Sequence, residues 1–300
     1  MNILLTGASG FLGKFIKTYF QIDNKVETLG RDVSCKYVCN LANEVPNFHN
    51  EFDVVIHAAG KAHVVPNSTA EADEFYIVNY KGTLNLLSAL EHQHLKSFVF
   101  ISSASVYGLE QGNNISELSP LIATDPYGKS KIEAEQIVQE WCNNHSVRCT
   151  ILRLPLVVGT NPPGNLGNLI EGIKKGYYFN IGGGEAKKSM VLATDVAKFI
   201  LKAAQIGGTY NLTDGYHPNF NELSNLIAKH LGKNKVKNIP NFIAKSIAKV
   251  GDVFGSRAPL NSDKFKKITS TLTFDDSKAR AAFGWNPTPV LEGFKIHDDL

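Results

Sequence analysis

A tyrosine and a lysine stand four residues apart in the stretch TDPYGKSK. Tyr127 and Lys131 follow Asp125 and Pro126, which suit the N-cap and the first position of a helix. At this spacing the two side chains lie one turn apart on the same helix face. A lysine cation beside a phenol favours the phenolate, so Lys131 is expected to lower the pKa of Tyr127 from about 10. The pair predicts an acid–base group that works near neutral pH.

Serines precede this pair in the stretch FVFISSASVYG. Ser102, Ser103 and Ser105 follow an apolar run that predicts a buried strand. A hydroxyl at the end of that strand could orient a substrate oxygen beside the tyrosine. A tyrosine and a lysine alone are also typical of a surface contact. The serines and the glycine turn described next favour the catalytic interpretation.

Three glycines spaced three apart lie in LLTGASGFLG, between a predicted strand and a predicted helix. A dinucleotide site needs Gly7 for a tight turn, Gly10 for close approach of a pyrophosphate, and Gly13 for helix–strand packing. The helix N-terminus then offers free N–H groups to the phosphates. An ordinary strand-to-helix turn is the alternative, and the position directly after the first strand favours the nucleotide.

The end of the second predicted strand bears on which dinucleotide binds. An acidic residue is expected there to bind the ribose 2′-hydroxyl of NAD, but the sequence has Gly30 and Arg31. A guanidinium suits a 2′-phosphate. The sequence therefore favours NADP(H), with NAD(H) as the alternative.

Strands and helices alternate through the first half of the chain. Strands are predicted over 2–7, 25–30, 53–60, 97–103 and 148–159, and helices over 11–20, 74–95 and 126–141. This alternation predicts an α/β fold, a Rossmann-type doubly wound parallel sheet, which binds ligands at the carboxyl ends of its strands.

The second half changes character after a Pro/Gly/Asn-rich loop at 159–167. We expect residues 1–158 to form the dinucleotide-binding domain, to which 190–213 return as a helix and a strand. Residues 159–189 and 214–300 are expected to form a smaller, partly interleaved α/β substrate domain. The segment 242–254 is amphipathic and is predicted to be a packed helix rather than a membrane anchor.

Composition excludes several classes of function. The 300 residues are 43% hydrophobic and 20% charged, with a net charge of +3, which is ordinary for a soluble globular protein and argues against nucleic acid as a partner. There is no apolar run of 18 residues, so no membrane insertion is expected. Four cysteines suggest neither a disulfide framework nor a metal site. The expected location is the reducing cytoplasm.

Together these motifs resemble the extended short-chain dehydrogenase/reductases that act on nucleotide sugars. The resemblance rests on TGASGFLG, HAAG (57–60), VNYKGTLNLL (78–87), FVFISSASVYG (98–108), PYGKSK (126–131), LRLPLVVG (152–159) and TFDDSKARAAFGW (273–285). It covers nearly the whole chain. It implies that Tyr127 is the acid–base group, that Lys131 binds the nicotinamide ribose, and that Ser103 binds the reacting sugar oxygen. A homodimer is also a family expectation.

The resemblance assigns the remaining candidate residues to two groups. Expected at the cofactor are Gly7, Gly10, Phe11, Leu12, Gly13, Arg31, Asn40, Leu41, Ala58, Ala59, Gly60, Lys61, Asn79, Lys131 and Pro155. Expected at the substrate are Ser105, Asn165, Leu166 and Lys188. Asn40 and Leu41 stand where the family usually has an aspartate followed by an apolar residue beside the adenine, and Asn40 departs from that pattern. Asn79 could equally be a buried polar residue that only supports the fold.

Three reactions share this framework. A 4,6-dehydratase needs Asp–Glu after the serine, but Ala104 and Ser105 follow Ser103, so dehydration is disfavoured. The tail and RLPLVVG resemble NADPH-dependent 4-ketoreductases of UDP-linked deoxy-N-acetylhexosamines, which is the favoured reaction. SSASVYG resembles the 4-epimerases of UDP-hexoses and UDP-N-acetylhexosamines with tightly bound NAD. A non-catalytic sensor or scaffold is the alternative of another class, and the presence of Ser103, Tyr127 and Lys131 argues against it.

Overall fold

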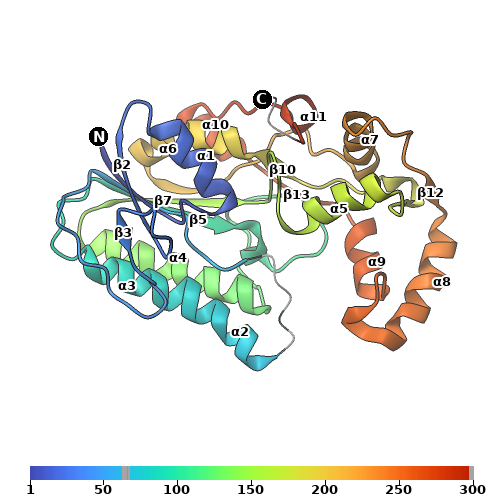
Figure 1. The fold of residues 1–300 in the computed structure, drawn as a ribbon, viewed down its shortest axis with the longest axis horizontal. Helices are drawn as coiled ribbons and strands as arrows, with labels where there is room; N and C mark the ends of the chain where they lie inside the picture. Colours follow the sequence, from blue (N-terminus) through green and yellow to red (C-terminus); the bar gives the residue numbers. More distant parts are fainter. Residues whose placement is uncertain (63–65, 67, 297–300) are drawn as a thin grey trace.

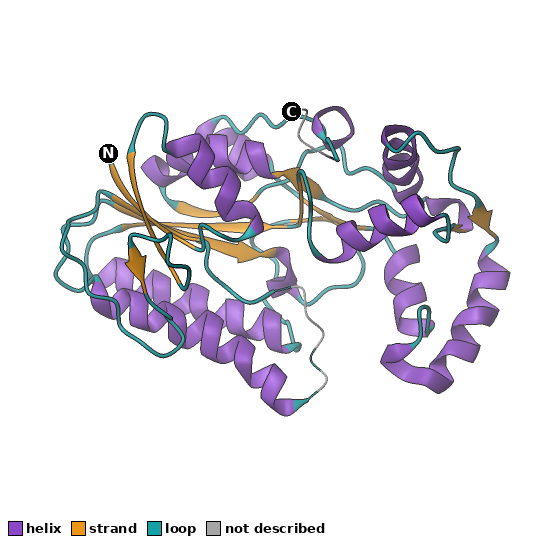
Figure 2. Ribbon diagram, viewed as in Figure 1, coloured by secondary structure: helices purple, strands orange, loops and turns teal. Residues whose placement is uncertain are grey.

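A seven-stranded sheet forms the centre of the protein, as seen in a computed structural model that describes residues 1–62, 66 and 68–296 (Figures 1 and 2). Each pair of neighbouring strands in it is parallel. Across the sheet the strands are β11 (Gly208–Asn211), β7 (Arg148–Leu154), β5 (Ser97–Ser103), β4 (Val54–His57), β1 (Asn2–Thr6), β2 (Lys25–Gly30) and β3 (Tyr37–Val38). The order reverses direction between β1 and β4, which is where doubly wound sheets open a ligand crevice.

Helices cover both faces of this sheet (Figure 1). One face carries α1 (Phe11–Phe20), α6 (Ala193–Ile206) and α10 (Ser277–Phe283). The other carries α2 (Thr69–Phe75), the π-helical turn η1 (Tyr76–Lys81), α3 (Gly82–Ala89) and α4 (Pro126–Asn144). Successive side chains of a strand point to opposite faces. Ile3 and Leu5 of β1 accordingly pack towards α1 and α6, while Leu4 packs towards α3 and α4.

The remaining chain builds the part of the molecule to the right in Figure 1. Three two-stranded parallel sheets pair β8 (Leu156–Val158) with β10 (Met190–Leu192), β9 (Asn180–Ile181) with β12 (Asn238–Ile239), and β6 (Gly112–Ile115) with β13 (Leu272–Phe274). The helices here are α5 (Gly164–Lys175), α7 (Phe220–His230), α8 (Asn241–Gly251), α9 (Ser262–Thr269) and α11 (Val290–Gly293). Short 3-10 turns are η2 (Ala104–Tyr107), η3 (Gly182–Gly184) and η4 (Asp252–Arg257). No helix in the described part of the chain is long and apolar enough to cross a bilayer.

The Rossmann-type fold predicted from the sequence is confirmed. The predicted strand over 148–159 is divided, because Pro155 separates β7 from β8 and has no N–H to donate to a strand ladder. The short β8, β9, β10, β12 and β13 pairings were not predicted. The domain boundaries stay a prediction. A third core cluster links Val158 and Leu169 with Leu192, Leu223 and Val290, so distant segments share one apolar centre.

Candidate functional site

The first glycine turn leaves no room for side chains. Gly7 has a φ of +72°, and a Cβ there would lie 2.6 Å from the backbone that follows β4. A Cβ at Gly13 would lie 2.0 Å from the Gly7 carbonyl oxygen. Gly10 is the N-cap of α1, and no side chain caps that helix. The first N–H groups of α1, including those of Phe11 and Leu12, are therefore open to an anion such as a pyrophosphate.

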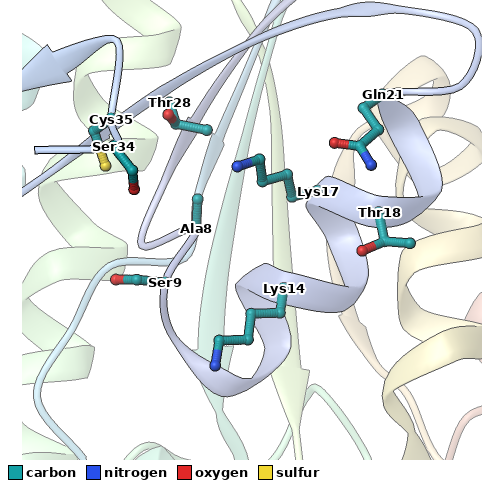
Figure 3. A pocket seen from close by; sticks show the side chains of 9 residues that line it. All are labelled: Ala8, Ser9, Lys14, Lys17, Thr18, Gln21, Thr28, Ser34 and Cys35. Carbon is teal, nitrogen blue, oxygen red and sulfur yellow. The ribbon is translucent and has the colours of Figure 1, made fainter. Parts of the chain in front are cut away.

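A cavity of about 350 Å³ lies beside this turn, between α1 and β2 (Figure 3). Lys14 and Lys17 of α1 line it together with Thr28 of β2 and Ser34. Figure 3 shows the Lys17 side chain pointing across the cavity towards Thr28. Arg31, which the sequence favoured at this position, is exposed in the loop that follows β2. Two lysines and two hydroxyls give this end of the site the chemistry of a phosphate pocket.

Asn40 and Leu41 have different surroundings. The Asn40 carbonyl oxygen accepts the backbone N–H of Asn43 (2.9 Å), which closes a turn. The Leu41 side chain is buried in the core between the sheet and α3. The Leu41 carbonyl oxygen accepts a hydrogen bond from Asn85 Nδ2 of α3 (2.7 Å). Leu41 therefore anchors the loop, and only the half-buried Asn40 side chain remains partly open to a ligand.

The loop after β4 is tied to the helices by one buried asparagine. This loop comprises Ala58, Ala59, Gly60 and Lys61. Asn79, in the π-helical turn, accepts the Lys61 N–H at Oδ1 (2.7 Å) and donates from Nδ2 to the Lys61 carbonyl (3.1 Å) and to Ser130 Oγ of α4 (2.9 Å). A Cβ at Gly60 would lie 3.0 Å from Asn79 Oδ1 and 3.3 Å from Lys131 Nζ. The glycine keeps a narrow, side-chain-free surface, as a dinucleotide passing over the loop requires.

Ser103 and Tyr127 meet at the carboxyl end of β5. Ser103 Oγ accepts the Ser105 N–H (3.1 Å), and the two serine hydroxyls lie 3.1 Å apart. Asp125 caps α4 and so fixes the start of the helix that carries Tyr127. Burial raises the pKa of Tyr127, and a hydrogen bond with Ser103 partly opposes that rise. This pair of hydroxyls can hold one substrate oxygen and exchange a proton with it.

Lys131 is buried against β5. Its Nζ donates to the Ile101 carbonyl oxygen (2.9 Å) and lies 4.6 Å from the Phe100 ring centroid. Burial lowers the pKa of Lys131 to about 8, and the Glu135 charge opposes that shift. The prediction that Lys131 lowers the pKa of Tyr127 is wrong in this structure, because burial of the phenol dominates and raises that pKa.

A buried polar network packs next to Ser103 and Lys131. Arg153 Nη2 of β7 pairs with Glu135 of α4 at 2.7 Å, and Glu135 also accepts the Ser102 hydroxyl (2.5 Å). Arg153 Nη1 donates to the Tyr107 hydroxyl (3.2 Å), which donates to Asn211 (2.7 Å). The network joins β5, β7 and α4 next to Ser103 and one turn from Lys131, so it holds both in position.

The predicted substrate residues are only partly brought together. Ser105 is exposed beside Ser103. Pro155, which was expected at the cofactor, is half-buried between β7 and β8. Asn165 is exposed in the first turn of α5. Leu166 is only 2% exposed, packed in the third core cluster, which leaves little of it to contact a substrate. Lys188 is half-buried, and burial lowers its pKa.

Sequence reasoning missed two features of the site. Lys14 and Lys17 face the cavity, and their spacing of three after the glycine turn was a signal that could have identified them. The Phe75 ring lies 5.9 Å from the Tyr127 ring and 5.2 Å from Lys61 Nζ, and Lys61 forms an ion pair with Glu74. No pattern in the sequence joins these four residues.

Comparison with known proteins places this geometry in a family. Residues 3–213 match the model of the NAD dependent epimerase/dehydratase family. The match contains the glycine turn, Asn79, Ser103, Tyr127 and Lys131.

Individual relatives cover almost the whole chain. An N-acetyl-α-D-glucosaminyl-diphospho-ditrans,octacis-undecaprenol 4-epimerase of Escherichia coli O157:H7 is 29% identical over 97% of this chain and 92% of its own length. A UDP-glucose 4-epimerase of Vibrio cholerae is 28% identical over 98% and 93%. Among solved structures, a UDP-glucose 4-epimerase from Thermotoga maritima, with UDP-glucose, has a TM-score of 0.75 and 21% identity over 98% and 96%.

Proposed function

Because the chain belongs to the NAD-dependent epimerase/dehydratase family, we propose that it is a 4-epimerase of a sugar carried on a diphosphate. The observation that supports this most is that 4-epimerases match 97–98% of the chain while Ser103, Tyr127 and Lys131 are all in place. The sequence alone favoured a 4-ketoreductase, and these relatives reverse that order. The sugar is a hexose or an N-acetylhexosamine, and its carrier is a nucleoside or a polyprenol, the two kinds named among the relatives.

The residues present fit a nicotinamide dinucleotide. Gly7, Gly13 and Gly60 clear the surface it would cross, the N-terminus of α1 faces its pyrophosphate, and Lys131 would hold the nicotinamide ribose. When bound, the nicotinamide accepts a hydride and returns it.

Tyr127 carries the proton transfer in this proposal. It removes the proton of the C4 hydroxyl in the oxidation half and returns a proton to the C4 oxygen in the reduction half. Ser103 donates a hydrogen bond to that oxygen and keeps it within reach of the phenol. The raised pKa of Tyr127 suits the donating half of the cycle. The other half needs the phenolate, which the hydrogen bond with Ser103 favours because it opposes the rise in that pKa.

The direct test is to identify the cofactor and the reaction of the purified protein. Denaturation should release a dinucleotide in near-equal amount, and UDP-N-acetylglucosamine or UDP-glucose should be converted to its 4-epimer without added cofactor. Protein that is empty after purification and consumes NADPH with a UDP-4-keto sugar would contradict the epimerase.

One observation supports the 4-ketoreductase as a second candidate. Lys14 and Lys17 line the cavity at the end of β2, where an acid would mark NAD, and two lysines suit the 2′-phosphate of NADPH. Lys17→Ala and Arg31→Ala should each weaken NADPH binding more than NADH binding. Lys174→Ala, an exposed lysine of α5, is the control. Equal losses for both dinucleotides would remove the argument for NADPH. A cytoplasmic location stays a prediction.

A further inference from the structure

Helix α8 and the turn η4 turn their large apolar side chains outwards. We call these six residues the α8–η4 face: Phe242, Ile243, Ile247, Val250, Val253 and Phe254. Val253 is 84% exposed and Phe242 is 73% exposed. In Figure 1 this segment forms the outer edge of the molecule, at the end opposite β2 and β3. The expectation that 242–254 is a packed helix is therefore wrong for its apolar side.

Close packing on the opposite side of α8 explains this exposure. Ala244, Ala248 and Gly251 are buried, and they share one side of the helix. A Cβ at Gly251 would lie 1.9 Å from the Leu260 carbonyl oxygen and 3.2 Å from the Ala258 Cβ. A larger residue at position 251 would not fit against 258–260. The helix therefore packs through its small residues, and its large apolar side chains stay on the outer side.

The segment of sequence that contains this face is strongly basic. Residues 229–267 contain ten Lys or Arg and two Asp or Glu, a net charge of +8, whereas the rest of the chain contains 21 and 26, a net charge of −5. Lys245 and Lys249 lie on α8 beside the apolar residues and form no ion pair with any residue that the structure describes. Lys266 and Lys267 pair with Glu110, so the charges available to an external anionic surface are those of Lys245 and Lys249.

We propose that the α8–η4 face docks on the surface of a bilayer that contains anionic phospholipid. A helix with exposed phenylalanine and isoleucine on one side and lysines beside them can bury the apolar residues at the acyl boundary while the ammonium groups meet phosphates. A nucleic acid partner would pair with the lysines but would leave the six apolar side chains exposed to water. The proposal goes beyond the proposed function: it would place the enzyme where a polyprenol-carried substrate is presented.

Vesicle co-sedimentation of the full-length protein tests this. The probes are phosphatidylcholine vesicles and phosphatidylcholine vesicles with one-quarter phosphatidylglycerol, at low and high salt. We expect binding to the anionic vesicles, weakened by salt because the lysines contribute through screened charge. The double variants Phe242→Ser/Phe254→Ser and Lys245→Glu/Lys249→Glu should each weaken it by about tenfold or more.

Matched controls distinguish an effect that is specific to the α8–η4 face from the effect of removing apolar side chains or reversing charges elsewhere on the surface. Leu118→Ser/Ile22→Ser removes two apolar side chains that are 94% and 74% exposed elsewhere. Lys174→Glu/Lys175→Glu reverses two exposed lysines on α5. Both controls should bind vesicles like the wild type. Thermal melting checks that every variant folds.

Tryptophan fluorescence offers a second readout, which detects contact of the face with lipid directly and not through a loss of binding. Phe254→Trp adds an exposed indole, while Trp141 and Trp285 are at most 9% exposed. Its fluorescence should shift to the blue with anionic vesicles and be quenched by brominated lipid. An unchanged spectrum would overturn the proposal.

Three other results would also overturn the proposal. In the first, the protein sediments to the same extent whether or not anionic vesicles are present. In the second, both face variants bind vesicles as strongly as the wild type does. In the third, the wild type is a dimer without lipid and the face variants are monomers. Turnover of a soluble UDP-sugar without vesicles distinguishes this proposal from the proposed function. The face variants should keep that turnover, and Tyr127→Phe should lose turnover while still binding vesicles.

Discussion

The proton chemistry that we propose for the site depends on a phenol and a lysine whose pKa values are both shifted by burial. The pKa of Tyr127 is raised, and that of Lys131 is lowered to about 8. Burial disfavours the charged form of each group, so it opposes the simple pairing that their spacing predicts. The roles we propose for them depend on the crevice as a whole.

Replacing Tyr127 by phenylalanine tests its proposed role. Because the phenol would exchange a proton with the C4 oxygen, Tyr127→Phe should lower kcat by about 10²- to 10⁴-fold. The variant should keep its melting temperature and its dinucleotide. Tyr19→Phe, an exposed tyrosine on α1, is the control and should have wild-type kcat. Equal kcat for Tyr127→Phe and wild type would remove Tyr127 from the mechanism.

His57 supports the site as a neutral residue. Thr83 Oγ1 donates to the Asn79 carbonyl oxygen (2.6 Å), so it accepts a hydrogen bond from the N–H at His57 Nε2 (3.0 Å). His57 Nδ1, 2.6 Å from Thr6 Oγ1, is then the acceptor of the Thr6 hydroxyl. Burial, and then the charge of Lys131, lowers the pKa of His57 from 6.5 to about 3. The imidazole is thus a spacer between β1, β4 and α3.

This lowered pKa predicts a loss of stability in acid. Between pH 6.5 and pH 3 the unfolded chain binds a proton at His57 that the folded chain does not bind. The free energy of unfolding should therefore fall by about 1.4 kcal/mol for each pH unit below 6.5 from this group alone.

The check is urea unfolding at pH 6.5, 5.5 and 4.5. His57→Gln should show a slope smaller by that amount, and His94→Gln, an exposed histidine, should show the wild-type slope. Identical slopes for wild type and His57→Gln would contradict the buried neutral histidine.

Local spacing makes some residues of the site predictable and leaves others hidden. Ser103, Tyr127 and the glycines could be identified because each lies at a strand end or helix start that the sequence marks. The ion pair between Lys61 and Glu74 and the burial of Leu41 in the core could not be predicted from the sequence. Both depend on tertiary contacts between separate segments of the chain.

At the scale of elements, the turn between β1 and α1 sets how closely the helix approaches the sheet. Gly13→Ala would place a Cβ 2.0 Å from the Gly7 carbonyl oxygen, which neither backbone can avoid without shifting. We expect a loss of about 1–3 kcal/mol in the free energy of unfolding, as for overpacked cores, with weaker dinucleotide binding.

Denaturant unfolding and dinucleotide titration measure both effects. Gly82→Ala is the matched control, because its Cβ would make only ordinary contacts at 3.5 Å or more within α3. It should be neutral or slightly stabilising, since alanine favours helix more than glycine does. Equal behaviour of the two variants would contradict the close approach at Gly13.

The order of the long elements follows from hydrophobic alternation, whereas the short pairings do not. β1, β2 and α1 match their predicted ranges within a residue or two. Strands β9 and β12 have only two residues each, too few to show a period. Their pairing depends on contacts across 57 or more residues of chain.

In the whole molecule, the crevice faces a basic part of the chain. It lies at the carboxyl ends of the long sheet, and residues 229–267, with a net charge of +8, lie beyond it in the part of the molecule to the right in Figure 1. Lys266 and Lys267 of that segment pair with Glu110. A homodimer, expected from the family resemblance, stays a prediction.

We propose that the protein inverts C4 of a diphosphate-linked sugar by removing and returning the same hydride. The most direct test is proton NMR of UDP-N-acetylglucosamine that carries deuterium at C4, incubated with the purified protein. We predict UDP-N-acetylgalactosamine with the deuterium still at C4, formed by wild type and not by Tyr127→Phe. An epimer that has exchanged its deuterium for solvent hydrogen would contradict this mechanism. So would the absence of any epimer from this sugar, from UDP-glucose and from N-acetylglucosaminyl-diphospho-undecaprenol.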